Sequence, residues 1–267
     1  MPSALQAAIL GIVQGVTEFL PVSSTAHLLL GGRLLGFQDP DGVFTVMIQL
    51  GSVLAVVWLY RAKIAEVVVG LPTKPEAQHF ALMLLVAFLP AAVLGALLSG
   101  FIKRVLYKTF MVMAVTFILG GIVILIVERR QKTIRVRVID RTPLSTAFGI
   151  GLCQALALVP GVSRSGGTII GALLLGLDRP AAAEFSFFLA IPTMAAAFAH
   201  DLYEVRHSLT AARAGDIAIG FVMAFLASVV VVKPFLEFIR RSGFGPFAWY
   251  RIVLGVCLFA ALTAGWL

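Results

Sequence analysis

Two short stretches of this sequence combine residues that could carry chemistry. The first contains Gln14, Glu18, Ser23, Ser24 and His27 within fourteen positions. Gln14 and Glu18 are four residues apart, so they share one face of a helix. A carboxylate, two hydroxyls and an imidazole at this spacing could move protons or hold a cation. The apolar residues around them strengthen this reading, because ionisable groups inside membrane segments are costly and are usually functional.

The second stretch, residues 160–168, has the composition of an anion-binding loop. Its polar members are Ser163, Arg164, Ser165 and Thr168. Glycines between them let the backbone approach a ligand closely, and a helix is expected to begin near Gly166. Backbone amides at a helix start and a guanidinium both favour phosphate. The stretch therefore predicts a phosphate cradle.

Each stretch also has a purely structural interpretation. Glu18 and His27 could satisfy one another inside the protein, while Ser23 and Ser24 cap the following helix. Arg164 could pair with Glu18 as a structural ion pair, because an unpaired arginine at membrane depth is expensive. The clustering of these residues favours a functional site, and we expect the Arg164–Glu18 pair to form in the resting protein.

The elements that must position these residues are membrane helices. The chain has 267 residues, of which 60% are hydrophobic and only 13% charged, a composition that indicates a polytopic membrane protein. The basic residues that give the net charge of +8 lie in short loops. This placement indicates a role in orienting the protein in the bilayer and not a nucleic-acid partner. Six stretches are long and apolar enough to span: Val43–Tyr60, Phe80–Ile102, Thr109–Val127, Glu184–Ala199, Ile217–Val232 and Phe247–Trp266.

Two further apolar stretches, Ala4–Gly36 and Leu144–Gly176, are interrupted at the polar residues described above. Each is predicted to form a helix, a break and a short helix, re-entering the membrane from one side. An offset of 140 residues (154 minus 14) aligns Gln14 with Gln154 and Ser23 with Ser163. We therefore predict one all-α integral membrane domain over residues 1–267. It would be an inverted-topology repeat (about 1–130 and 141–267), each half a re-entrant hairpin plus three transmembrane helices.

The basic residues predict the orientation of this arrangement. Most lie in the loops after the first, third and fifth spans, notably between Arg129 and Arg141, which places those loops in the cytoplasm. Arg251 is expected to snorkel from a span end. Asp201, Glu204 and His207 are close in sequence, but their spacing specifies no metal site.

Both interrupted stretches resemble a known family. Residues 14–27, QGVTEFLPVSSTAH, resemble the (E/Q)xxxE and PxSSxxH signature of the undecaprenyl pyrophosphate phosphatases, the bacitracin-resistance family. Residues 160–168, PGVSRSGGT, resemble that family's PGxSRSxxT motif. The two motifs occur in the expected order in a chain of the usual size, so the resemblance covers nearly the whole length.

The resemblance implies a bacterial inner-membrane enzyme. It would hydrolyse undecaprenyl (C55) diphosphate to the monophosphate and inorganic phosphate, recycling the carrier for peptidoglycan and conferring bacitracin resistance. By this resemblance the catalytic residues are Glu18, Ser24, His27 and Arg164. The residues around the diphosphate are Gln14, Ser23, Ser163, Ser165 and Thr168.

Several finer expectations follow from the same residues. Ser24 would attack or would orient a water, His27 would transfer protons, and Glu18 would either position His27 or bind a divalent cation, Mg²⁺ or Ca²⁺. Glutamine at position 14 weakens a mechanism in which two carboxylates hold one metal. By the family resemblance, we expect the site to open to the extracytoplasmic side and a polyprenyl diphosphate to be the substrate. The lipid bilayer is the other expected partner, and the sequence is compatible with a homodimer.

A different function class is also compatible with the pattern. Secondary transporters use inverted repeats with broken helices that meet near the membrane midplane and hold anions. A transporter or lipid-phosphate flippase on this scaffold is therefore the alternative. A glutamate, serine, histidine and arginine together exceed what anion binding requires, which favours hydrolysis.

Overall fold

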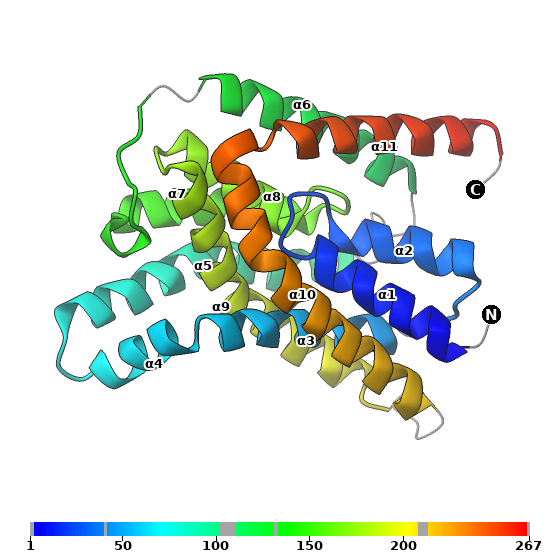
Figure 1. Ribbon diagram of the computed structural model, residues 1–267, viewed down its shortest axis with the longest axis horizontal. Coiled ribbons are helices and arrows are strands. Elements are labelled where there is room, and N and C mark those ends of the chain that lie inside the picture. Colours follow the sequence, from blue (N-terminus) through cyan, green and yellow to red (C-terminus); the bar gives the residue numbers. More distant parts are fainter. Residues whose placement is uncertain (1–2, 40–41, 102–109, 131–132, 208–212, 266–267) are drawn as a thin grey trace.

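The computed structural model describes residues 3–39, 42–101, 110–130, 133–207 and 213–265, and in these ranges the regular elements are helices (Figure 1). The predicted span ends Ile102, Thr109 and Trp266 lie outside these ranges. The helices are α1 (Ser3–Thr17), α2 (Ser24–Leu35), α3 (Val43–Leu59), α4 (Arg61–Gly70), α5 (Pro75–Phe101), α6 (Phe110–Arg130), α7 (Leu144–Ala155), α8 (Arg164–Leu174), α9 (Arg179–Val205), α10 (Ala214–Ser242) and α11 (Gly245–Thr263). The predicted all-α membrane architecture is confirmed.

Both predicted helix breaks are present. α1 ends at Thr17 and α2 begins at Ser24, while α7 and a short 3-10 turn (Leu156–Leu158) are followed by α8 at Arg164. All four helices are shorter than the ~20 residues needed to cross a bilayer. Because freed backbone groups must be satisfied at such breaks, the two polar loops need protein partners inside the molecule.

Within the described residues, five helices are long and apolar enough to span a membrane: α5, α6, α9, α10 and α11. A sixth candidate is the pair α3 and α4, which bends by 74°. The sequence predicted a straight span ending at Tyr60 and gave no sign of the helix that continues from Arg61. α4 contains charged residues and two exposed valines, Val68 and Val69, a composition suited to a membrane surface.

The two halves of the chain follow the same order, a broken hairpin and then long helices. Residues matched by the 140-residue offset also adopt similar geometry. Gly11 on α1 and Gly151 on α7 each lie against the backbone of another helix, at Gly220 and Ala87 respectively, where a Cβ would clash. This agreement supports an internal repeat, and the inversion of the second copy stays a prediction.

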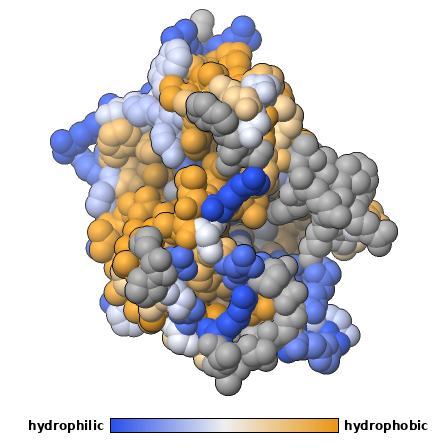
Figure 2. Space-filling model, turned by 90° about the vertical axis from the view of Figure 1, so that its right-hand side faces the viewer, coloured by the Kyte–Doolittle hydropathy of each residue, from blue (hydrophilic) through white to orange (hydrophobic). Residues whose placement is uncertain are grey.

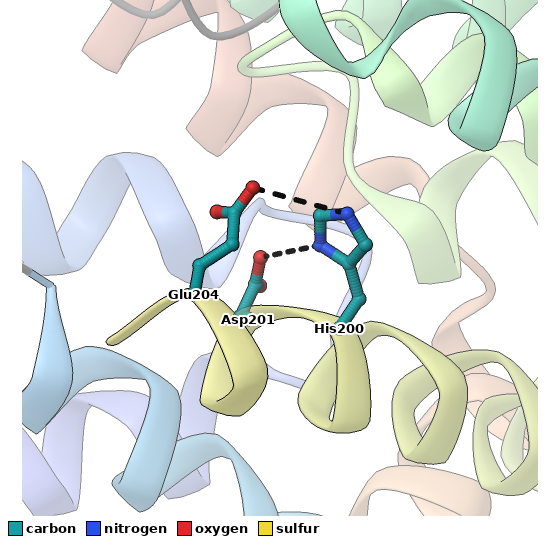
Figure 3. A group of neighbouring side chains, drawn as sticks. All are labelled: His200, Asp201 and Glu204. Carbon is teal, nitrogen blue, oxygen red and sulfur yellow. Dashed lines mark hydrogen bonds and ion pairs between the residues drawn. The ribbon is translucent and has the colours of Figure 1, made fainter. Parts of the chain in front are cut away.

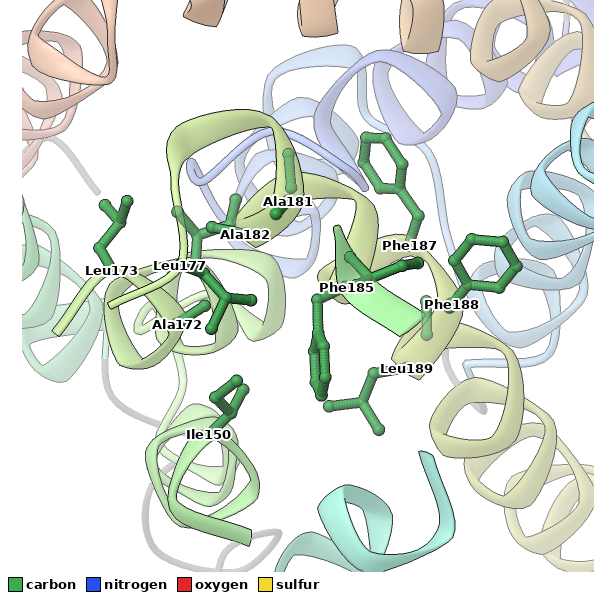
Figure 4. Close-up of a cluster of buried hydrophobic side chains, with 14 of the residues drawn as sticks. Ile150, Ala172, Leu173, Leu177, Ala181, Ala182, Phe185, Phe187, Phe188 and Leu189 are labelled. Carbon is green, nitrogen blue, oxygen red and sulfur yellow. The ribbon is translucent and has the colours of Figure 1, made fainter. Parts of the chain in front are cut away.

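Buried aromatic and aliphatic side chains of α7, α8, α9 and the segment between α8 and α9 form a cluster (Figure 4). Phe185 and Leu189 on α9 are fully buried there on the side of the helix that faces Ile150, whereas Phe187 points to the other side, toward Phe19. Outside, hydrophobic side chains cover much of the described part of the face in Figure 2. Val230 and Val253 are 71% and 58% exposed, as expected for side chains that face lipid.

Candidate active site

Glu18 is the centre of a hydrogen-bonded group formed at the first break. Its side chain is 4% exposed. The Oε2 atom accepts a hydrogen bond from Ser24 Oγ at 2.6 Å and another from Gln14 Nε2 at 2.9 Å. Gln14 and Glu18 adjoin because they are one helical turn apart, as their spacing predicted. Ser24, the first residue of α2, reaches back across the break to the same carboxylate.

Arg164 joins the second break to the first. Its Nη2 lies 2.9 Å from Glu18 Oε1, which confirms the expected pair. Its Nη1 donates to the backbone oxygen of Ser186 on α9 at 2.9 Å. The Nε atom is buried, and the described residues provide no hydrogen-bond acceptor for it. Gln14 Oε1 is likewise buried without a donor.

His27 faces a different set of partners. Its Nδ1 lies 2.8 Å from the Ser23 backbone oxygen, and its Nε2 lies 2.6 Å from Tyr250 Oη on α11. Because a carbonyl only accepts, Nδ1 carries the proton and Nε2 of the neutral ring accepts from Tyr250. Both ring nitrogens are therefore engaged away from Glu18, and the idea that Glu18 and His27 satisfy each other is wrong for this arrangement.

The remaining predicted residues hold the second break in place. Ser163 caps α8 by accepting from the Gly166 amide at 3.1 Å. Ser165 Oγ donates to the Leu20 backbone oxygen at 2.7 Å, which ties the two breaks together. Thr168 is fully buried and donates to the Arg164 backbone oxygen at 2.9 Å. The hydroxyls of Ser165 and Thr168 thus bond to protein and not to the Glu18 group.

Both breaks share an unusual backbone conformation. Ser23 has φ of 68° and Ser163 has φ of 77°, and among the described residues these are the non-glycine residues with positive φ. The left-handed region disfavours side chains with a Cβ and costs of order 1–3 kcal/mol per residue. The conformation turns the chain sharply into α2 and α8, so that Ser24 and Arg164 stand at the helix starts.

Arg251 on α11 was the main residue that sequence reasoning misplaced. It was expected to snorkel to the membrane surface, but it is fully buried. Its guanidinium donates to the backbone oxygens of Pro21, Gly161, Val162 and Thr116 at 2.9–3.1 Å. One side chain therefore satisfies carbonyls from both breaks and from α6. The signal in the sequence was an arginine six residues inside an apolar helix.

Gly120 on α6 makes room for this guanidinium. A Cβ at Gly120 would clash with Arg251 Nη2. In Figure 1, α6 and α11 run side by side along the top of the view, where Gly121 also approaches the Ala248 backbone. The close contact between these two helices brings Arg251 to the breaks.

A second group of potential metal ligands lies elsewhere on α9. His200, Asp201 and Glu204 place three ligand atoms within 4.8 Å of one another (Figure 3). His200 joins the two carboxylates here, not His207 as grouped from the sequence. The His200 side chain is 52% exposed. His200 follows Ser186 by 14 residues on α9, which corresponds to ~21 Å along the helix axis. We do not assign it to the site.

A family model described as the bacitracin resistance protein BacA matches residues 7–257. This match includes both breaks and the helices that hold them. The chain belongs to the BacA family. Curated relatives agree over nearly the full length. An undecaprenyl-diphosphatase 1 from Agrobacterium fabrum is 51% identical over 260 residues, which cover 97% of each chain. An undecaprenyl-diphosphatase from Paracoccus denitrificans is 50% identical over 264 residues, which cover 99% of each chain.

For this BacA-family chain, the motifs predicted residues that the structure brings together, but they did not predict all of the residues that bond to them. Four predicted residues, Gln14, Glu18, Ser24 and Arg164, form one connected group. Tyr250 and Arg251 belong to neither motif, yet they bond to His27 and to both breaks. Their partners lie up to 230 residues away along the chain, so local spacing could not reveal them.

Proposed function

We propose that this protein hydrolyses undecaprenyl diphosphate to undecaprenyl phosphate and inorganic phosphate in the bacterial inner membrane. Membership of the BacA family and the full-length likeness to undecaprenyl-diphosphatases support this function. The observation that carries it is the meeting of Arg164 from one break with Glu18 from the other at 2.9 Å. Ser24 stands 2.6 Å from that carboxylate, so a phosphate-binding cation, a nucleophile and a base adjoin.

In this mechanism the terminal phosphate of the substrate competes with Glu18 for Arg164. A guanidinium binds phosphate oxygens well and offsets the charge that develops in phosphoryl transfer. The unpartnered Nε of Arg164 supplies a further donor. When Arg164 turns to the phosphate, Glu18 Oε1 loses its ion-pair partner, while Glu18 Oε2 keeps its hydrogen bond with Ser24.

Ser24 is the proposed nucleophile. Its Oγ attacks the terminal phosphorus and passes its proton to Glu18 Oε2, with which it is already hydrogen-bonded. The bond between that phosphorus and the bridging oxygen breaks, and the lipid monophosphate leaves. Water then hydrolyses the serine phosphate to give inorganic phosphate. His27, held by Ser23 and Tyr250, is the proposed group that gives or takes protons at Nε2.

A divalent cation fits the oxygen atoms of this site. Gln14 Oε1 is buried and receives no hydrogen bond from the described residues, and Gln14 Nε2 donates to the Glu18 carboxylate. Amide and carboxylate oxygens are ligands that Mg²⁺ and Ca²⁺ accept, together with phosphate oxygens of a substrate. Gln14 and Glu18 would hold the ion, which would supply charge neutralisation on the diphosphate.

The site is proposed to open to the extracytoplasmic side, and this rests on the family resemblance. It can be tested with Ser24→Cys in a background without Cys153 and Cys257, using a membrane-impermeant thiol reagent on intact cells and on inverted vesicles. The predicted homodimer and the absence of a nucleic-acid partner stay predictions.

The deciding experiment measures phosphate release from a polyprenyl diphosphate by the detergent-purified full chain. The assay is run with and without Mg²⁺ or Ca²⁺, beside Arg164→Ala and Ser24→Ala. Release by the wild type that both variants lack supports the proposal. Phosphate release by the Ser24→Ala variant would show that water, and not Ser24, is the nucleophile.

The transporter alternative is not favoured, because the matched relatives carry a diphosphatase name. One result would revive it: folded protein that moves lipid monophosphate between leaflets and releases no phosphate under any metal condition.

A further inference from the structure

A hollow at the base of the second hairpin is separate from the Glu18 group. It has a volume of about 370 Å³ and lies between the end of α6, the following loop, the start of α7 and the end of α8. Its polar lining residues are Arg130, Thr133, Arg135 and Thr146. Its apolar lining residues are Val127, Leu173, Leu174 and Leu175, with Gly176.

The loop that carries Arg135 is fixed to the end of the second hairpin. The Arg135 amide donates to the Gly176 backbone oxygen at 2.8 Å, and Val136 forms an isolated bridge with Leu177. The aliphatic stem of Arg135 packs beside Gly176, within contact distance of a Cβ built there. The position of one guanidinium-bearing residue is therefore set by backbone bonds.

The two arginines of the hollow have no carboxylate partner among the described residues. The acidic side chains of the adjoining segments bind elsewhere: Glu128 to Arg179, Asp140 to Lys63 and Asp178 to the Ala181 amide. The hydroxyls of Thr133 and Thr146 also make no hydrogen bond within the described ranges. Two cations and two hydroxyl groups without a described partner thus line one cavity, and no described carboxylate lines it.

The walls of the hollow place it at the membrane boundary. Leu174 is 61% exposed and Leu175 is 37% exposed, whereas the loop from Arg129 to Arg141 is rich in arginine. The excess of basic residues marks this loop as cytoplasmic. Exposed leucines directly beside two arginines match the two parts of a lipid, the acyl chain and the charged headgroup.

We propose that this hollow binds the headgroup of an anionic phospholipid of the inner leaflet, with Arg130 and Arg135 on the phosphate and the leucines along the acyl chains. Basic pockets between membrane helices on the cytoplasmic side recognise such headgroups. A free phosphate would satisfy the arginines but would leave the exposed leucines uncovered. This binding is independent of the hydrolytic site, which is built on the opposite end of α8.

The test titrates delipidated full-length protein with phosphatidylglycerol or phosphatidylcholine and counts bound lipids by native mass spectrometry. Arg130→Gln/Arg135→Gln removes both charges of the hollow. Arg129→Gln/Arg137→Gln is the matched control, because it removes the same charge from exposed arginines of the same segment that do not line the hollow. Thr146→Phe fills the hollow without a change of charge.

We expect the wild type to prefer phosphatidylglycerol, and we expect the hollow variant to lose roughly tenfold in affinity. Thr146→Phe should lose affinity as well, while the control stays within about twofold of the wild type. Equal losses of lipid affinity in both charge variants, or an unchanged lipid affinity in Thr146→Phe, would overturn the proposal. Either result would mean that the arginines attract anionic lipid without a specific site. Full displacement by inorganic phosphate would overturn it in favour of a free-anion site. Melting curves of each variant confirm that it is folded.

Discussion

Tyr250 stacks on His27 and also bonds to it. The ring centroids are 5.7 Å apart, the planes are inclined by 14°, and the hydroxyl lies 2.6 Å from His27 Nε2. α11 therefore fixes both the orientation and the tautomer of the imidazole.

Tyr250→Phe should remove the hydrogen bond and keep the stacking. Because proton transfer depends on a correctly oriented imidazole, we expect kcat to fall roughly tenfold to a hundredfold with little change in KM, and the pH profile of kcat to change. Tyr203→Phe, an exposed tyrosine at the end of α9, is the control. An unchanged pH profile in Tyr250→Phe would show that the contact is only structural.

Glu18→Gln should nearly abolish phosphate release. The amide keeps a hydrogen-bonding oxygen for Ser24 but cannot take its proton, so a loss of at least about a hundredfold is expected. Glu237→Gln, which removes an exposed i,i+4 pair with Arg241, should have no effect on turnover. Near-normal turnover of folded Glu18→Gln would remove this carboxylate from the mechanism.

Arg164→Lys keeps the charge but loses the planar fork that reaches both Glu18 and Ser186. We expect phosphate release to fall by about a hundredfold or more, since one ammonium cannot replace these donors. Arg179→Lys is a matched control, because Arg179 also pairs with a carboxylate of another helix, Glu128, at 2.9 Å. Equal activity of the two variants would contradict the role given to Arg164.

Gly120→Ala should disturb the two breaks indirectly, through Arg251, although Gly120 belongs to neither break. The added methyl displaces the Arg251 guanidinium, and overpacking of this kind costs about 1–3 kcal/mol. Both the melting temperature and kcat should fall, whereas Gly215→Ala, with open space around its Cβ position, should change neither. A melting temperature equal to that of the wild type would mean that the Arg251 side chain can adopt another conformation at no cost in stability.

Gln14→Glu tests the proposed cation. A second carboxylate beside Glu18 should bind Mg²⁺ or Ca²⁺ more tightly, so the metal concentration that gives half-maximal phosphate release should fall several-fold. Chelation by EDTA should remove activity from both proteins. The same half-saturation value in both would place the metal away from residue 14.

The sequence was informative where local pattern decides structure. The breaks at Ser23 and Ser163, the shared face of Gln14 and Glu18, and the Arg164–Glu18 pair could all be inferred from spacing and from the cost of a lone charge. The bend after Tyr60 could not, because the charged residues that follow, Arg61 and Lys63, mark the end of an apolar run and do not show that a second helix begins there. Arg251 was misplaced because its acceptors include backbone oxygens of two distant breaks. Every residue has a backbone carbonyl, so residue types do not show which carbonyls need a donor.

The positive φ angles of Ser23 and Ser163 have a consequence for protein engineering. A glycine adopts this conformation without strain, so replacing either serine by glycine relieves a backbone penalty of order 1–3 kcal/mol. At Ser163 the same change deletes the cap of α8. A selection for heat resistance alone would thus be drawn to the two positions from which the site is built, and thermostable variants from such a screen should be checked for lost turnover first.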